Sequence, residues 1–131
     1  MDEHTLMLIK PNAINKIGSI LKIIEDNGFT INQMKMFQMD CQFAESFYSI
    51  HKDKPFFDIL IKFMTSDRIV ALDLTKNNAV SDLRDLIGDT DYRKAKIGTV
   101  RYLYANDLTQ NAVHGSDSVE NAKSEIKLVF K

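Results

Sequence analysis

The sequence contains one cysteine, Cys41, two prolines and no tryptophan. A lone cysteine excludes a disulfide within the chain and a thiolate metal cluster, and it fits a reducing compartment, so we expect a cytoplasmic protein. No apolar run approaches the roughly 20 residues that a membrane-spanning helix needs, so no membrane partner is expected. Neither sign of charge dominates, because 17 Lys and Arg residues stand against 18 Asp and Glu residues, a net charge of −1. The chain therefore has no general attraction for nucleic acid, and any anion site must be local.

The rest of the composition is typical of a folded domain. Hydrophobic residues make up 44% and charged residues 27% of the 131 residues, which indicates neither a disordered chain nor a fibrous repeat. A chain of this length buries one core, so we expect a single domain over residues 1–131.

Hydrophobic spacing predicts alternating strands and helices. Short apolar runs bounded by proline or glycine predict strands, while apolar residues spaced three and four apart predict helices. The phase of the second strand slips near Gln33, which indicates a bulge. The predicted strands span residues 5–9, 29–39, 69–74 and 112–114, and the predicted helices span residues 13–27, 42–50, 57–65, 78–87 and 117–127.

This order of elements predicts the fold class. Two β-α-β halves that share one sheet are typical of an α+β, ferredoxin-like βαββαβ fold, with a four-stranded antiparallel sheet and helices packed on one face. Residues 89–110 show no clear period, and so long a loop is uncommon in a compact domain unless it is functional. We therefore expect this long loop to belong to the active site.

Three histidines, His4, His51 and His114, are candidates for reactive residues. The common glycine-rich phosphate-binding loops are absent, so a nucleotide site would have to be built otherwise. His114 alone lies between the long loop and a predicted helix start, flanked by small residues that leave room for a ligand. A lone histidine in a loop is more often a solvated or capping residue, so spacing alone does not assign it a catalytic role.

Motifs from one end of the chain to the other place His114 in a wider pattern. Leu8-Ile9-Lys10-Pro11 lies near the start and Asn111-Ala112-Val113-His114-Gly115-Ser116-Asp117 near the end. Between them lie Phe47-Tyr48-x-x-His51, Lys54-Pro55-Phe56-Phe57, Phe63-Met64-Thr65-Ser66, Leu83-Arg84-x-Leu86-x-Gly88-x-Thr90 and Gly98-Thr99-Val100-Arg101. With these motifs in register, the chain from Glu3 to Phe130 resembles the nucleoside diphosphate kinase family.

The resemblance implies a reaction. It implies that the terminal phosphate of a nucleoside triphosphate passes to a nucleoside diphosphate by a ping-pong mechanism, through a phosphohistidine on His114, with Mg²⁺ bound through the nucleotide phosphates. Histidine suits this role, because a neutral imidazole is nucleophilic near neutral pH and its phosphoramidate is reactive enough to be passed on.

The resemblance also implies which residues assist His114. Glu120 would hold the ring nitrogen that does not attack, and Ser116 would support that pair. The alternative role for Glu120 is the third helical residue of a capping box that Asp117 opens. Tyr48 would place its hydroxyl near the transferring phosphate, although it could also be a half-buried helix aromatic with its hydroxyl in water.

A further set of residues would bind the nucleotide. The base would stack on Phe56, and because an aromatic face accepts any base, the resemblance implies broad base specificity. Leu60 and Leu108 would complete the slot, although either could equally be a core residue, and His51 could touch a phosphate. Arg84, Thr90 and Arg101 would supply charge and donors to the phosphates, as phosphoryl transfer requires. The implied nucleotide-binding residues are Lys10, Phe56, Leu60, Arg84, Thr90, Arg101, Leu108 and Asn111, of which Lys10 would reach the sugar and phosphates and Asn111 the sugar.

The sequence departs from the family pattern in its loops. Thr65-Ser66-Asp67-Arg68 replaces the usual Thr-Ser-Gly-Pro, and the long loop lacks two prolines usual in the family, at Thr90-Asp91-Tyr92 and Ile97-Gly98-Thr99. We therefore expect a less restricted backbone there. In this family the long loop contributes to subunit contacts, and the resemblance implies a homo-oligomer, either a tetramer or a hexamer built from dimers.

Two alternatives belong to other functional classes. The altered loop would suit a non-catalytic nucleotide-binding or assembly module of the same family, although every implied site residue is retained. The order of elements would also suit a nucleic-acid-binding domain, but the predicted strands 5–9 and 69–74 lack the paired aromatics on which such domains stack bases, so no specific nucleic acid is expected.

Overall fold

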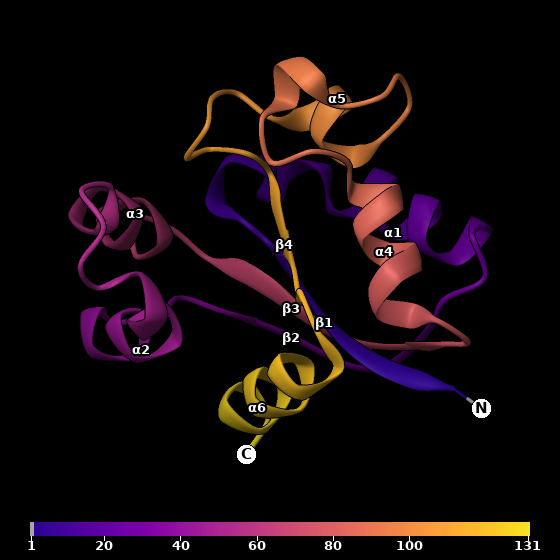
Figure 1. Cartoon of the computed structure of the whole chain (residues 1–131), viewed down its shortest axis with the longest axis horizontal. Coiled ribbons are helices and arrows are strands. Elements are labelled where there is room, and N and C mark those ends of the chain that lie inside the picture. The colour runs from indigo at the N-terminus through magenta and orange to yellow at the C-terminus, as the bar shows by residue number, and fades with distance from the viewer. Residues whose placement is uncertain (1) are drawn as a thin grey trace.

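The structure, a computed structural model, describes residues 2–131 (Figure 1). None of the helices in this range is long and apolar enough to cross a bilayer. The strands are β1 (Glu3–Ile9), β2 (Thr30–Phe37), β3 (Ile69–Lys76) and β4 (Val113–Gly115). The α-helices are α1 (Ile17–Asp26), α2 (Cys41–Phe47), α3 (Phe57–Met64), α4 (Ala79–Ile87), α5 (Val100–Tyr104) and α6 (Val119–Val129), and the 3₁₀ helices are η1 (Pro11–Lys16), η2 (Ser49–His51) and η3 (Tyr92–Lys94).

The four strands form one antiparallel sheet in the order β2-β3-β1-β4. This order confirms the predicted ferredoxin-like α+β fold. The strand β1 lies inside the sheet, so that Leu8 pairs with Ala71 of β3 on one side and with His114 of β4 on the other. The register therefore places His114 beside the carboxyl end of β1.

Helices cover both faces of the sheet, so the prediction of helices on one face was wrong. Met7 and Ile9 of β1 pack with α1 and α4, whereas Leu6 and Leu8 pack with α2, α3 and α6. Figure 1 shows these two groups of helices on either side of the strands. The two crossover helices of the βαββαβ unit account for the first face, and the helical hairpin and the last helix cover the second. Alternate residues of a strand point to opposite faces, and burial on both faces explains why Leu6 to Ile9 of β1 are all apolar.

The predicted boundaries mostly hold, and the differences lie at element ends. The bulge in β2 is confirmed by a register shift between Ile31 and Gln33. The helix predicted over residues 13–27 begins earlier, as η1 with Pro11 in its first turn, and ends before Gly28, whose φ of 87° suits glycine. The helix predicted over residues 42–50 is divided between α2 and η2.

The long loop is not structureless. Residues 89–110 contain η3 and α5, and the side chain of Thr99 caps α5 by accepting a hydrogen bond from the backbone N–H of Tyr102. The five-residue α5 is too short to show a helical period in the sequence, which is why the pattern missed it. The loop thus folds back over the carboxyl end of β1 and the amino end of β4 (Figure 1).

Candidate active site

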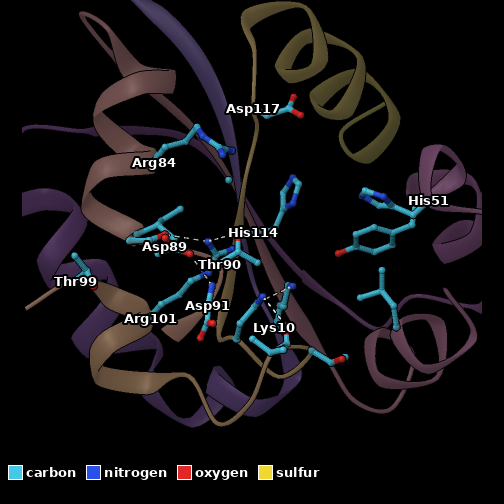
Figure 2. A pocket seen from close by; sticks show the side chains of 18 of the residues that line it. Lys10, His51, Arg84, Asp89, Thr90, Asp91, Thr99, Arg101, His114 and Asp117 are labelled. Atoms are coloured by element: carbon cyan, nitrogen blue, oxygen red, sulfur yellow. Dashed lines mark hydrogen bonds between the residues drawn. The ribbon is translucent and has the colours of Figure 1, made fainter. Parts of the chain in front are cut away.

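A cleft of about 1370 Å³ opens where the ends of β1 and β4 meet the long loop. Segments far apart in the sequence line the cleft: Lys10, which directly follows β1, the helices α2, α3, α4 and α6, and the loop that precedes β4. Figure 2 shows Arg84 and Arg101 on one side of His114 and His51 on the other. Glu120 and Ser116 do not line this cleft, but the other predicted catalytic and nucleotide-binding residues do: Lys10, Tyr48, Phe56, Leu60, Arg84, Thr90, Arg101, Leu108, Asn111 and His114.

His114 lies on β4 with its side chain 20% exposed. Its Nε2 lies 3.1 Å from Oε1 of Glu125. An ionised carboxylate only accepts hydrogen bonds, so this contact requires Nε2 to donate and leaves the lone pair of the neutral ring on Nδ1. The ring of Phe47 packs nearly perpendicular to the imidazole, with centroids 5.4 Å apart. The histidine is therefore held in one tautomer and between fixed neighbours.

The glutamate that contacts His114 is Glu125, so the prediction of Glu120 was wrong. The helix α6 begins at Val119 with Ser118 as its N-cap, which also rules out the predicted capping box at Asp117. Glu120 then lies in the exposed first turn and outside the cleft. The resemblance had been carried onto Glu120, for which the capping spacing offered only an alternative role.

A periodic pattern in α6 could have identified Glu125. Ala122, Ile126 and Val129 are the inward-facing apolar residues of the helix, and Glu125 lies in the same stripe at helical spacing. A carboxylate among inward-facing apolar residues requires a partner, because burial of an unpaired charge is costly.

Ser116 supports this pair, as expected, but through the corrected glutamate. Its fully buried hydroxyl donates to Oε1 of Glu125 at 2.6 Å and accepts from the backbone N–H of Leu6 at 3.3 Å. The serine thus connects the carboxylate to β1. Hydrogen bonds thus run from His114 to Glu125, from Glu125 to Ser116, and from Ser116 to the backbone of β1 in the sheet.

The small residue after His114 has a packing role. A Cβ added at Gly115 would lie 2.7 Å from Cδ1 of Ile87. A larger residue would therefore force the end of the Ile87 side chain in α4 to move. Glycine allows the nucleophile candidate and α4, which carries Arg84, to approach closely.

Lys10 is the most deeply buried cation of the cleft, with 6% of the residue exposed. Its Nζ donates to Oδ1 of Asn111 at 2.8 Å, and its backbone N–H donates to the carbonyl of Ala112 at 2.8 Å. Burial, and secondarily the charge of Arg101, lowers the pKa of Lys10 to about 7. The side chain is thus placed to gain a proton when an anion enters.

The backbone between Asn111 and His114 is strained. Ala112 is buried and has a φ of 77°, a region that favours glycine. The backbone N–H of Val113 donates to the carbonyl of Asn111 at 3.0 Å, which closes a tight three-residue turn at Ala112. This turn sends the Asn111 side chain toward Lys10 while His114 enters the sheet.

Arg101 extends from α5 into the cleft. Its guanidinium donates to the carbonyls of Gly88 at 3.1 Å and Val113 at 2.9 Å, and to the hydroxyl of Thr90 at 3.5 Å. Burial, and secondarily the charge of Arg84, lowers the pKa of Arg101 to about 10, so that it remains a cation near neutral pH. One residue thereby ties the long loop to both α4 and β4.

Tyr48 presents an unused donor. Its hydroxyl is buried and has no hydrogen-bond partner within residues 2–131. Burial, and secondarily the negative charge of Glu125, raises the pKa of Tyr48, so the hydroxyl stays protonated. A buried unsatisfied hydroxyl is costly and suits a group that bonds to a ligand.

Apolar groups form the mouth of the cleft. Phe56 is 43% exposed and lies with its ring centroid 5.6 Å from that of His51. Leu108, which also lines the cleft, is 54% exposed, whereas Leu60 is 7% exposed and belongs to the core as well as to the cleft wall. The cleft therefore joins an aromatic, apolar outer end to an inner end rich in cations and donors, an arrangement that suits a base at one end and phosphates at the other.

Comparisons with known proteins agree with this geometry. The family model described as nucleoside diphosphate kinase matches residues 3–131. The nucleoside diphosphate kinase of Lawsonia intracellularis is 51% identical over 130 residues, which cover 98% of this chain and 94% of that protein. That of Campylobacter jejuni is 48% identical over 131 residues, which cover 98% of this chain and 96% of that protein.

Solved structures show the same fold. The structure of the Aquifex aeolicus nucleoside diphosphate kinase superposes with a TM-score of 0.96 at 38% identity, covering 100% of this chain and 96% of that one. A halophilic nucleoside diphosphate kinase from Halobacterium salinarum, solved in complex with CDP, gives a TM-score of 0.95 at 36% identity, covering 100% of this chain and 89% of that one.

Proposed function

The chain belongs to the nucleoside diphosphate kinase family, and we propose that it carries the transferred phosphoryl group on Nδ1 of His114. Its activity is the transfer of the terminal phosphate of a nucleoside triphosphate to a nucleoside diphosphate. The observation that supports His114 is its bond to Glu125, which fixes Nε2 as the donor and leaves the Nδ1 lone pair for attack.

The reaction then consists of two displacements at one site. In the first, the Nδ1 lone pair of His114 forms a bond to the terminal phosphorus, and the bond from that phosphorus to the bridging oxygen breaks, so the diphosphate leaves with the electron pair. The ring, still protonated on Nε2, becomes positive, and the carboxylate of Glu125 stabilises this charge. In the second, an oxygen of the acceptor diphosphate attacks the phosphorus, and the electron pair of the N–P bond returns to Nδ1.

Other residues of the cleft stabilise the transferring group. Arg84, Arg101 and Lys10 would neutralise negative charge that spreads over the phosphate oxygens. The Thr90 hydroxyl and the unpaired Tyr48 hydroxyl would donate hydrogen bonds to the same oxygens. Removing a single donor of this kind typically lowers the rate by about 10²- to 10³-fold.

We propose that Mg²⁺ enters with the nucleotide. No group of three or more His, Cys, Asp and Glu side chains in residues 2–131 is placed to hold a metal ion, whereas Lys10, Arg101 and Asn111 in the cleft suit phosphate oxygens. The ion would therefore be held through the nucleotide phosphates, where it offsets their charge.

The nucleoside would occupy the outer end of the cleft. Phe56 offers a face for the base, with Leu60 and Leu108 around it, and Asn111 would bond to the sugar. The relative from Halobacterium salinarum was solved with CDP, which supports nucleotides as ligands. Stacking between apolar groups favours no particular base, so we propose broad base specificity.

We also propose that the protein is a homo-oligomer, a tetramer or hexamer built from dimers. β2 is an edge strand whose residues are mostly exposed, including Met34 at 58% and Met36 at 49%. An exposed edge with apolar side chains is a natural surface for strand pairing with a second copy. We propose further that residues 1–131 form one domain and that the protein is cytoplasmic, which fits its single, unpaired Cys41.

The non-catalytic alternative is not favoured, because the cleft retains a nucleophile, its partner carboxylate and the phosphate-binding cations. Incubation with radiolabelled ATP and Mg²⁺ should produce an acid-labile, base-stable phosphoprotein. The label should vanish in His114→Ala and persist in His4→Ala, which alters a histidine outside the cleft. Label that survives in His114→Ala would disprove the assignment of this residue.

A further inference from the structure

Asn12 holds part of the long loop against the end of β1. It lies in η1, two residues after Lys10. Its Nδ2 donates to Oδ1 of Asn106 at 2.7 Å and to the carbonyl of Gln110 at 2.9 Å, and it lies 3.4 Å from the carbonyl of Tyr104. An amide nitrogen carries two hydrogens, so the two shorter contacts account for both of them. One side chain thus connects Asn106 and Gln110, within the segment 104–110, to η1 at the end of β1.

The other hydrogen bonds of this segment are mainly internal. The carboxylate of Asp107 accepts hydrogen bonds from the backbone N–H groups of Thr109 and Gln110, at 2.9 and 2.6 Å. The backbone N–H of Asn106 donates to the carbonyl of Gln110 at 2.7 Å. These bonds set the shape of the turn, but they do not place it relative to the cleft.

The turn carries two groups of the proposed nucleotide site. Leu108 at its tip lines the outer end of the cleft, and Asn111 follows it directly. The Asn111 amide donates to the carbonyl of Leu108 at 3.1 Å and accepts from Lys10. Any movement of the turn would therefore displace Leu108 and Asn111, which are proposed to contact the base and the sugar.

We propose that Asn12 is a positioning residue that fixes the 104–110 turn for nucleotide binding. The inference rests on the proposed function of the cleft. A loop with few prolines explores more conformations, and only the fraction with Leu108 and Asn111 in place binds nucleotide well. Asn12 raises that fraction without touching the nucleotide, since it does not line the cleft.

The chemistry of the contact requires a donor. The three atoms around Asn12 Nδ2 are all oxygens, so an aspartate here would place its carboxylate against them with no hydrogen to share. We therefore expect Asn12→Asp to weaken nucleotide binding more than Asn12→Ala. Loss of two hydrogen bonds is expected to weaken binding by up to about tenfold.

The test measures the affinity for ADP by titration calorimetry, which requires no turnover, alongside KM and kcat. Asn12→Ala and Asn12→Asp should raise the Kd for ADP and the KM while leaving kcat within about twofold, because His114 and Glu125 are untouched. Backbone amides of residues 104–110 should exchange faster with deuterium in both variants. Asn27→Ala is the matched control, since it removes an amide bond to the carbonyl of Ile23 outside the cleft.

Several outcomes would overturn the inference. An unchanged Kd for ADP in both Asn12 variants would do so, as would unchanged exchange of residues 104–110, or a fall in kcat at constant Kd. A lower melting temperature with wild-type Kd would show that Asn12 is only structural. Failure of the proposed function would look different, because the wild-type protein would then form no phosphohistidine.

Discussion

Binding of ADP at pH 8 is expected to draw about one proton from solution, because Lys10 is largely uncharged in the free protein. Its buried position holds its pKa at about 7. The phosphates of a bound nucleotide place negative charge beside Nζ, which favours the charged form and restores the pKa toward 10.5, its ordinary value.

The magnitude follows from these two pKa values. With a pKa of about 7, roughly a tenth of Lys10 is charged at pH 8 and roughly half at pH 7. In the complex it is almost fully charged at both. We therefore expect an uptake of about 0.9 proton per site at pH 8 and about 0.5 at pH 7. Arg101, with a pKa of about 10, is already charged at both values and contributes little.

The assay is calorimetric titration of ADP and Mg²⁺ at pH 8 in buffers with different ionisation enthalpies. The slope of the apparent binding enthalpy against the buffer enthalpy equals the number of protons taken up. Lys10→Arg keeps a permanent charge and should show almost no uptake. An uptake near zero in the wild type, or an equal uptake in Lys10→Arg, would refute the assignment.

The same shift affects the stability of the free protein. In the unfolded chain Lys10 keeps its proton up to about pH 10.5, whereas the folded protein releases it near pH 7. Between these values the unfolded state binds more protons, so this residue makes the free energy of unfolding rise with pH. Its destabilising effect is complete below pH 7 and disappears above pH 10.5.

Two further substitutions have matched controls in the chain. Glu125→Gln should slow phosphorylation by ATP about tenfold or more, because the charge-assisted bond to His114 is lost, whereas the control Glu120→Gln should leave the rate unchanged. The rate of phosphoenzyme formation is measured by rapid quench. Equal rates in the two variants would contradict the role of Glu125 as the partner of His114. Gly88→Ala should lower the free energy of unfolding by roughly 2–4 kcal/mol, and Gly98→Ala by about 1 kcal/mol. Both glycines have positive φ, 94° and 92°, but of the two only a Cβ at Gly88 would meet another side chain, the Thr99 hydroxyl at 2.5 Å. Urea unfolding measures the free energy of unfolding of each variant. An equal decrease in the two variants would disprove the steric argument.

Part of the site was predictable because it lies at element ends that the sequence marks. Pro11 ends β1 and Gly88 follows α4, so the residue pattern alone places Lys10 at the end of a strand and Arg84 in the last turn of a helix. The motif around His114 likewise predicted that this residue lies in the short strand β4. The phosphate-binding roles of these residues came from the motifs shared with the nucleoside diphosphate kinase family, and the internal contacts of the cleft came from neither source.

Other features depended on contacts between distant residues. The partner of His114 was wrong in the sequence-based prediction, since the resemblance was carried onto Glu120. The packing of α6 on β1 instead places Glu125 at the imidazole. The contact of Asn12 with Gln110 spans 98 positions and leaves no periodic pattern.

The sequence by itself determined the order of strands and helices, the antiparallel fold class and most members of the cleft. Local periodicity, proline and glycine are sufficient for the elements and the fold class, because they act over one or two turns of backbone, whereas the members of the cleft were implied by the motifs shared with the family. Only the tertiary structure decided that both faces of the sheet are covered, that Lys10 is buried enough to lose its proton, and that Glu125 fixes the tautomer of His114. Burial and hydrogen-bond direction depend on groups that strand register and helix packing bring together, and those distances are not encoded in local spacing.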